Sequence, residues 1–285
     1  MDRHSPLLQM FCLALVLGLG TVAPADSLQG VREQVRDKQP RPSAPKKEKH
    51  RHHHHDCDDD DGSDFWVSIV GPPVFWVTTS PWWVPASALG DDYSADGADF
   101  LSYPYQYDRG GWISLSGEPP PDFDGVGMWF SSEYGTDFSG LQRAGQRLRI
   151  DTGSRFGLDT EFNTWIEDIP AGHDTLFTGD ANLVYRFAQS ESWQWYSGLG
   201  MNWLSEDHFS EFGFNFTYGA TFTPAKPFVF ETTFDLGTLG DASLFHLHST
   251  GGVVWKHLEL FGGYDYLRIG NQDLHGPLIG ARIWW

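Results

Sequence analysis

Apolar and polar residues alternate along most of the chain from Asp122 to Trp285. In the run 211–222, every even position is aromatic or alanine, and every odd position is polar or glycine. Successive side chains of a β-strand point to opposite sides of the sheet, so such a run has one apolar face and one polar face. The pattern therefore predicts that this part of the protein is built from strands.

Ten segments carry the alternation, and each is near the length that a tilted strand needs to cross a bilayer. We expect short turns near 152–154 and 224–226, and longer loops such as 169–174 and 271–276 on the opposite side. This asymmetry is typical of transmembrane barrels. We therefore predict an all-β fold, an antiparallel up-and-down transmembrane β-barrel of about ten strands. The predicted strands are 125–134, 141–151, 155–166, 175–187, 194–204, 211–222, 227–237, 243–254, 257–267 and 277–285.

Alternation alone does not say which face points outward. A soluble barrel of the lipocalin type would hold the aromatic residues inside, whereas a membrane barrel would hold the charges inside. Lysine, which is common on soluble surfaces, occurs after residue 121 only as Lys226 and Lys256, both at predicted turns. Tyr and Trp gather at strand ends, as in the aromatic girdles of membrane barrels. We therefore predict a membrane barrel, with charges of both signs paired in its lumen. These lumen charges are Arg147, Arg149, Asp159, Glu161, Asp180, Arg186, Glu231, Asp235, Glu259 and Arg282.

Three segments precede the barrel domain, which we expect to span 122–285. Residues 1–25 contain a short apolar run followed by small residues, which is typical of a cleaved secretory signal peptide and too short for a transmembrane helix. Residues 26–64 are expected to be a disordered linker, first basic and then rich in His and Asp. Residues 65–121 combine aromatic residues with proline, which favours short extended pieces over a helix. Such a segment fits a membrane surface, a barrel mouth or a partner.

The net charge of the chain limits the kinds of molecule that it is expected to bind. The chain has 38 Asp and Glu against 19 Lys and Arg, a formal net charge of -19. Nucleic acid is excluded as a general partner, because phosphate binding needs a basic face. Two cysteines exclude a disulfide scaffold. The His- and Asp-rich tract offers ligands for a divalent metal, with a solvated spacer as the alternative, because its spacing matches no closed site. Its candidate ligands are His52, His53, His54, His55 and Cys57.

Two histidines offer a candidate chemistry in the lumen. His246 and His248 lie two residues apart in a predicted strand, so both are expected to point inward, and Ser249 follows them. With acidic residues of neighbouring strands, they could supply a base or bind a metal. The alternative is a polar filling in which these groups satisfy one another, as in narrow barrels. The chain has neither a Gly-x-Ser-x-Gly nor a His-Glu-x-x-His motif, and we expect no cofactor.

The C-terminal segment carries a more specific resemblance. Residues 277–285 have apolar side chains at alternate positions and end in an aromatic residue, Trp285. This segment resembles the closing strand of bacterial outer-membrane β-barrels, most of which end in Phe. The resemblance implies contact with outer-membrane lipid, insertion by the outer-membrane machinery through this end, and a linker in the periplasm. The runs 155–163 and 212–219 also resemble those of small secreted bacterial barrels, a resemblance that implies no activity.

Taken together, the sequence predicts an outer-membrane barrel with a polar, largely filled lumen, acting as a structural or interaction protein of the cell envelope. Two alternatives stay open. One is a narrow channel for ions or small solutes, and the other is an outer-membrane lipid hydrolase that uses a luminal histidine. A soluble ligand-binding barrel is the further possibility if the aromatic face points inward.

Overall fold

The computed structural model describes residues 27–36, 76–91, 98–115, 124–170, 172–206 and 209–285. The predicted signal peptide and the tract with the candidate metal ligands His52, His53, His54, His55 and Cys57 lie outside the described residues.

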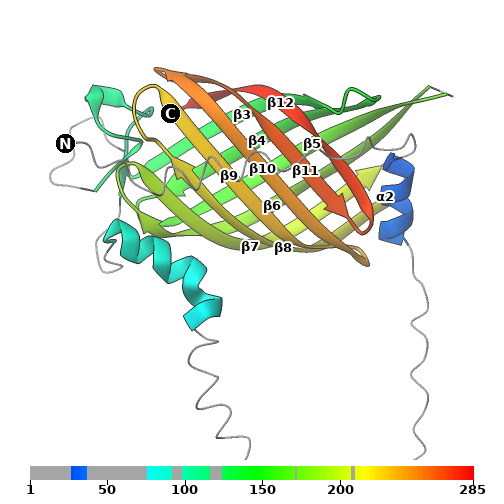
Figure 1. The fold of residues 1–285 in the computed structure, drawn as a ribbon, viewed down its shortest axis with the longest axis horizontal. Coiled ribbons are helices and arrows are strands. Elements are labelled where there is room, and N and C mark those ends of the chain that lie inside the picture. The colour runs from blue at the N-terminus through cyan, green and yellow to red at the C-terminus, as the bar shows by residue number, and fades with distance from the viewer. Residues whose placement is uncertain (1–26, 37–75, 92–97, 116–123, 171, 207–208) are drawn as a thin grey trace, which may run out of the picture.

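Ten antiparallel strands form a closed barrel (Figure 1), which confirms the predicted up-and-down topology. Each strand pairs with its neighbours in sequence, and the ring closes where β12 (Gln272–Trp284) pairs with β3 (Val126–Thr136). At this seam Trp285 and Met128 exchange two backbone hydrogen bonds of 2.9 and 3.0 Å. The other strands are β4 (Leu141–Thr152), β5 (Phe156–Ile169), β6 (Gly172–Gln189), β7 (Trp193–Glu206), β8 (Phe209–Phe222), β9 (Phe228–Leu239), β10 (Ala242–Trp255) and β11 (Leu258–Ile269).

The prediction of longer loops at one end is wrong. β11 ends at Ile269 and β12 already begins at Gln272, inside a stretch that was expected to be a loop. The alternation continues there, but its outward side chains are polar and bond across strands. The Tyr266 hydroxyl donates to Asp273 at 2.7 Å, and the hydroxyl of Tyr264 lies 2.7 Å from Nδ1 of His275. The strands therefore extend past the apolar band instead of giving way to loops.

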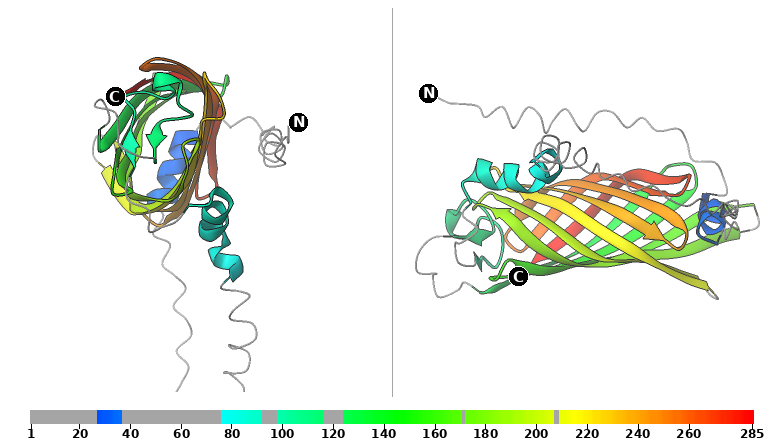
Figure 2. Two further views of the ribbon diagram at one scale, coloured as in Figure 1. Left: turned by 90° about the vertical axis from the view of Figure 1, so that its left-hand side faces the viewer. Right: turned by 90° about the horizontal axis from the view of Figure 1, so that it is seen from below.

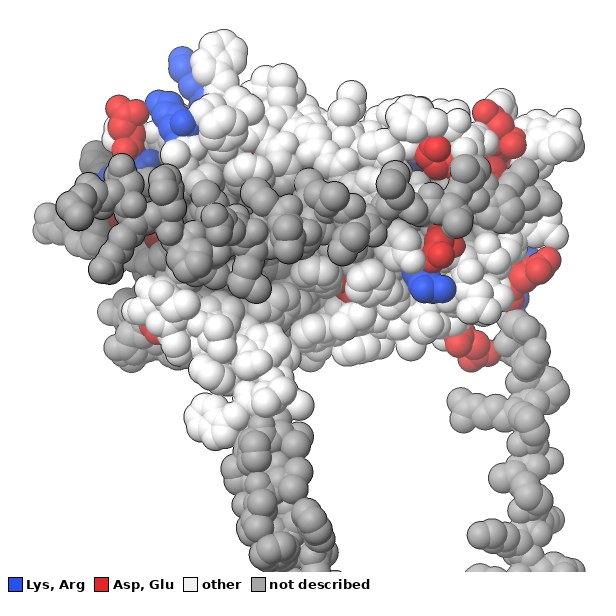
Figure 3. Space-filling model, viewed as in Figure 1, with Lys and Arg blue, Asp and Glu red and all other residues white. Residues whose placement is uncertain are grey.

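The outer surface is apolar around the middle of the barrel, while charged residues gather towards its two ends (Figure 3). Leu260 and Ile279, both on outward positions, are 61% and 69% exposed. The inward positions of the same strands carry charged residues such as Glu259 and Arg282, which are buried. This is the inside-out polarity of a transmembrane barrel and the reverse of a soluble one. Exposed apolar residues of this band are Phe130, Leu158, Phe162, Leu183, Leu199, Phe214, Phe234, Leu236, Leu260 and Ile279.

None of the helices described is both long and apolar enough to cross a membrane.

One mouth of the barrel is closed by α2 (Ser27–Arg36), which lies inside the ring of strands (Figure 2). Leu28, Val31 and Val35 are 0–3% exposed and pack on apolar residues at this end of the strands. The prediction of a linker disordered from residue 26 onward is therefore wrong for this stretch. Its three apolar residues could not hold a ten-residue helix in isolation, because short helices are marginal without tertiary packing. The barrel mouth supplies that packing.

Polar contacts fix the direction of α2 in the mouth. The Glu167 carboxylate accepts hydrogen bonds from the backbone N–H groups of Ser27 and Leu28 at 2.9 and 3.0 Å. It thus satisfies N–H groups that the first turn of a helix leaves without partners, and it complements the positive end of the helix dipole. Arg32 binds Asp174 at 2.7 Å and also Glu206. The hydrogen bonds that Arg32 donates to Asp174 raise the pKa of Arg32.

The other mouth is filled by residues 98–115, which include β1 (Asp99–Phe100), β2 (Ile113–Ser114) and the short helix η2 (Gln106–Asp108). The ring of Trp112 lies between those of Phe100 and Trp284, at 5.0 and 4.8 Å between centroids. Gly111 is required here, because a Cβ at this position would lie 1.7 Å from the carbonyl oxygen of Glu191. For residues 65–121 the sequence left open a membrane surface, a barrel mouth or a partner. The structure places residues 98–115 of this segment in the barrel mouth.

Burial in this mouth also raises the pKa of a tyrosine, Tyr105. The Tyr105 hydroxyl donates to the carbonyl oxygen of Phe228 at 2.5 Å, and loss of solvent raises its pKa to about 12. The hydroxyl therefore stays protonated and keeps this hydrogen bond at neutral pH.

Residues 76–89 form a helix on the outer wall of the barrel, so the prediction of extended pieces is wrong here. Prolines at positions 81 and 85 each remove one backbone hydrogen bond of the helix. The two carbonyl groups left free are those of Val77 and Pro81, and both find hydroxyl donors. Ser80 Oγ donates to the first at 2.7 Å, and the Tyr218 hydroxyl of the barrel wall donates to the second at 2.7 Å. These bonds explain why the helix tolerates both prolines.

The docking of α2 gives a testable prediction. Val31→Asp places a charge in an apolar mouth, so we expect α2 to detach from the mouth while the barrel stays folded. Trypsin should then cut at Arg32 and Arg36 much faster than in the wild-type chain. In the wild-type chain, Arg32 is bound to Asp174 and its side chain is mostly buried. Gln29→Asp, on the exposed side of the same helix, is the matched control. Equal cleavage rates for the two variants would contradict the docked position of α2.

Candidate functional site

A layer of charged residues fills the barrel between its two apolar mouths. It contains all ten lumen charges selected from the sequence, and each is buried. We call this layer the charged belt. Its members are Glu133, Arg143, Arg147, Arg149, Asp151, Asp159, Glu161, Asp180, Arg186, Glu231, Asp235, His246, His248, Glu259, Asp265 and Arg282.

Two arginines, on strands that both flank β3, share a carboxylate from across the ring. Arg147 of β4 binds Asp159 through Nε at 2.9 Å, and its Nη1 lies 3.1 Å from Glu231 of β9. Arg282 of β12 binds the same Glu231 at 2.6 Å and Glu259 at 3.1 Å. The belt thus joins strands that are not neighbours in the sheet, so it ties the walls of the barrel together through its centre.

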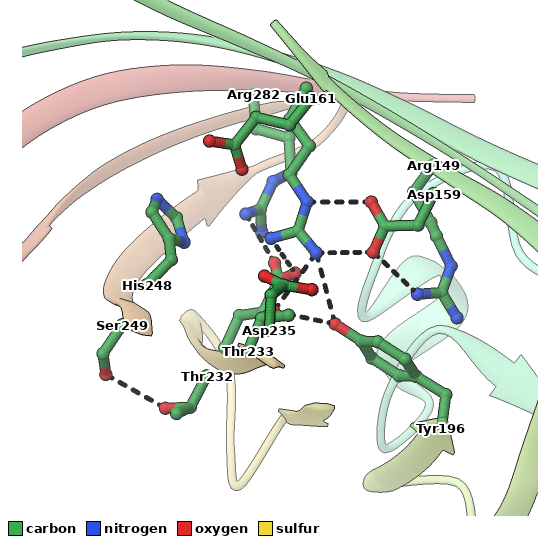
Figure 4. Close-up of polar contacts among 12 residues, drawn as sticks. Arg149, Asp159, Glu161, Tyr196, Thr232, Thr233, Asp235, His248, Ser249 and Arg282 are labelled. Atoms are coloured by element: carbon green, nitrogen blue, oxygen red, sulfur yellow. Dashed lines mark hydrogen bonds and ion pairs between the residues drawn. The ribbon is translucent and has the colours of Figure 1, made fainter. Parts of the chain in front are cut away.

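A second chain of ion pairs runs towards the mouth that residues 98–115 fill. Arg149 makes two 3.0 Å hydrogen bonds to Asp151. It also lies 3.3 Å from Asp159 (Figure 4). Its guanidinium also stacks over the ring of Tyr196 at 3.8 Å. Arg186 donates to Oδ1 of the same Asp151 at 2.8 Å. Each arginine of the belt thus forms an ion pair with at least one carboxylate. Such a pair is needed to offset the cost of removing the guanidinium charge from water.

The two histidines complete the belt on the side of α2. His246 Nε2 lies 2.8 Å from Asp265, and His248 Nε2 lies 3.2 Å from both carboxylate oxygens of Glu133. Arg143 binds Glu133 and lies 3.2 Å from Asp265. Asp235, the carboxylate on the other side of His246, is 3.6 Å from its Nδ1. Both predicted luminal histidines therefore lie in the interior, among acidic residues.

Three of these residues have the chemistry of a metal site. Glu133, His248 and Asp265 each offer one ligand atom, and these atoms lie within 4.8 Å of one another. Asp265 Oδ2 and His248 Nδ1 have no hydrogen-bond partner among the described residues. Arg143, however, contacts both carboxylates and supplies the positive charge that a metal ion would bring. The ion pairs with Arg143 therefore offset negative charge of Glu133 and Asp265 without a metal ion.

Ser249 lies on the other face of β10. Its hydroxyl is 3.0 Å from that of Thr232 and forms no part of the charged belt (Figure 4). Strand alternation requires this, because Ser249 follows the inward-facing His248 by one residue. The candidate trio His246, His248 and Ser249 is therefore not brought together, and Ser249 cannot act as a nucleophile activated by these histidines.

The space inside the described barrel is small. Two cavities have volumes of about 10 and 20 Å³; one is lined by Arg143 and Asp265, the other by Asp180 and His246. A single water needs about 10–15 Å³ by this measure. Each of these two cavities therefore has room for about one water.

Four residues of the charged belt are absent from the lumen charges predicted from the sequence. They are Glu133, Arg143, Asp151 and Asp265. A signal for the two in β4 was present, because inward positions recur every second residue and Arg143 and Asp151 have the same parity as Arg147. Glu133 and Asp265 alternate in the same way with the outward-facing Tyr134 and Tyr264. Consistent use of strand parity would have found all four.

Comparisons with known proteins add little. No protein family matches the chain, and neither does any curated protein. Among solved structures, the barrel is similar to the beta domain of the Bordetella autotransporter BrkA, with 10% sequence identity and a TM-score of 0.32. The match covers 57% of this chain and 99% of that one. A likeness of this degree supports no conclusion about function.

The ion pairs of the belt predict a large effect of losing one arginine. Arg147→Ala leaves Asp159 and Glu231 buried with less positive charge, so we expect a loss of about 3–5 kcal/mol in the free energy of unfolding. Urea unfolding in detergent, followed by tryptophan fluorescence, measures this. Arg268→Ala is the control, because Arg268 is half exposed and 3.4 Å from Asp273, so its removal should cost less than about 1 kcal/mol. Equal effects of both variants would contradict the role of the belt.

Proposed function

We propose that this protein is a non-conducting barrel of the bacterial outer membrane, acting as a structural or interaction protein of the cell envelope. The observation that carries the proposal is the closure of the interior at three successive levels. α2 closes one mouth, residues 98–115 close the other, and the charged belt fills the space between them.

Several observations support the membrane location. The middle of the barrel exposes a continuous apolar band, and charges lie inside or at the ends. Such a surface is unfavourable in water and matches the hydrocarbon layer. The resemblance of residues 277–285 to an outer-membrane closing strand favours the outer membrane and its insertion machinery. Both ends of the barrel domain emerge at the mouth that residues 98–115 fill. We place this mouth in the periplasm, which puts α2, the described part of the predicted periplasmic linker, at the mouth on the opposite side of the membrane.

The filled interior weighs against the channel and the hydrolase. A channel needs a continuous aqueous path, whereas the described cavities hold about one water each. A hydrolase needs room for substrate beside a base, and both histidines are 5% exposed or less. A rigid, closed barrel is suited instead to holding other segments at the membrane.

The membrane location is tested by fractionating cell envelopes by density. We expect the protein in the outer-membrane fraction, where an alkaline carbonate wash should leave it. In gels without boiling, the folded barrel should migrate differently from the boiled chain. A soluble periplasmic protein without a heat-dependent shift would contradict the proposal.

Closure of the lumen is tested by conductance in planar bilayers. We expect the wild-type protein to leave the membrane current at its background value. A variant lacking residues 27–36 should also stay silent, because the charged belt behind α2 still fills the lumen. An open porin serves as the positive control for insertion. Discrete, cation-selective openings of the wild-type protein would support a channel and overturn the closed-barrel proposal.

A further inference from the structure

The helix over residues 76–89 is seated on the part of the barrel wall that the proposed function places in lipid. It projects from the outer wall near the mouth that residues 98–115 fill (Figures 1 and 2). Trp82 contacts the rings of Phe216 and Tyr218, each at 6.2 Å between centroids and in edge-on geometry. Its indole N–H donates to the Ser197 hydroxyl at 3.0 Å. All three partners are outward-facing residues of β7 and β8.

The opposite side of this helix is apolar and uncovered. Val77, Trp83 and Val84 are 71%, 39% and 46% exposed. No Asp, Glu, Lys or Arg occurs from residue 65 to residue 90. A helix between a protein surface and water carries charges on its outer face, whereas this helix has none, and its polar residues are the neutral Thr78, Thr79, Ser80 and Ser87. The apolar side is continuous with the exposed apolar band of the barrel.

The backbone of the helix is also prepared for such an environment. In hydrocarbon, a carbonyl group without a donor is costly because no water can replace the missing bond. The two carbonyls that the prolines free, those of Val77 and Pro81, are bonded by the hydroxyls of Ser80 and Tyr218. In water neither bond would be needed.

The first charged residue after the helix fixes its polar end at the barrel rim. Asp91 accepts two hydrogen bonds from Arg155, both of 2.8 Å, and one from the backbone N–H of Gln189 at 2.9 Å. The charged pair thus marks the rim, and the helix extends from it along the wall without another charge.

We propose that residues 76–89 form an anchor helix embedded in the membrane leaflet beside this mouth, with phospholipid acyl chains covering Val77, Trp83 and Val84. This inference rests on the proposed location of the barrel in a membrane. Tryptophan near the rim suits the boundary between headgroups and acyl chains, where an amphipathic ring is stabilised. The helix widens the contact of a narrow barrel with one leaflet.

The test measures which solvent surrounds the helix. In a full-length chain with Cys12→Ser and Cys57→Ser, a nitroxide label is attached at Val77→Cys or Val84→Cys, and the protein is reconstituted in phosphatidylcholine vesicles. Collisions with oxygen, which concentrates in hydrocarbon, are compared with collisions with a water-soluble nickel chelate. Leu260→Cys on the barrel wall is the lipid reference, and Ser139→Cys in the exposed β3–β4 turn is the aqueous reference.

The proposal expects the ratio of oxygen to nickel collisions at both helix positions to match that at Leu260→Cys. Ratios that match Ser139→Cys, with Leu260→Cys still in lipid, would overturn the anchor helix and leave the membrane barrel intact. An aqueous ratio at Leu260→Cys would overturn the membrane barrel itself, and the anchor with it. Helix labels that are open to nickel in vesicles but shielded from both reagents in native outer membranes would identify a protein partner instead of lipid.

Discussion

The pairing of buried guanidinium groups is the constraint on which the rest of this structure depends. Transferring a charge out of water costs several kcal/mol even after relaxation, and only close partners offset that cost. Four of the five arginines of the belt meet carboxylates from more than one strand, as Arg147 does with Asp159 and Glu231. Aromatic rings complete the contacts, with Arg282 lying 4.2 Å from the ring centroid of Trp129. A barrel with another strand register would lose these pairs, so the belt selects one arrangement of the ring.

The apolar mouths and the charged belt depend on each other. α2 and residues 98–115 exclude water from the two ends, which lowers the local dielectric constant and strengthens every ion pair between them. The same low dielectric makes an unpaired group costly, and carboxylates outnumber arginines in the belt. His246 and His248 bond Asp265 and Glu133, and so satisfy two carboxylates that the arginines share. These contacts account for the burial of both histidines in the interior.

The sequence predicts the barrel well and its detailed contacts poorly, for physical reasons. Alternation determines which side of a strand each residue faces, so the inward arginines and histidines were predictable. Pairing depends on register and on the lean of long side chains. Arg147 stands opposite Glu161 in the ladder, yet its bidentate partner is the diagonal Asp159. α2 was not predictable, because its three apolar residues acquire a packing surface only once the mouth exists. The helix over residues 76–89 was not predictable either, because the Tyr218 hydroxyl that satisfies one of its carbonyls lies far away in sequence.

The seam between β3 and β12 has a consequence for how the chain folds. It pairs Trp129 with Trp284, residues separated by more than half the length of the chain. Such contacts of high sequence separation are slow to form, because the entropy of closing a long loop must be overcome before they stabilise anything. The charged belt draws on both sides of this seam, so its arginines lack part of their compensation until the last strand arrives. The barrel is therefore expected to fold late and cooperatively, and to depend on assistance that keeps the unclosed sheet edges from aggregating in the meantime.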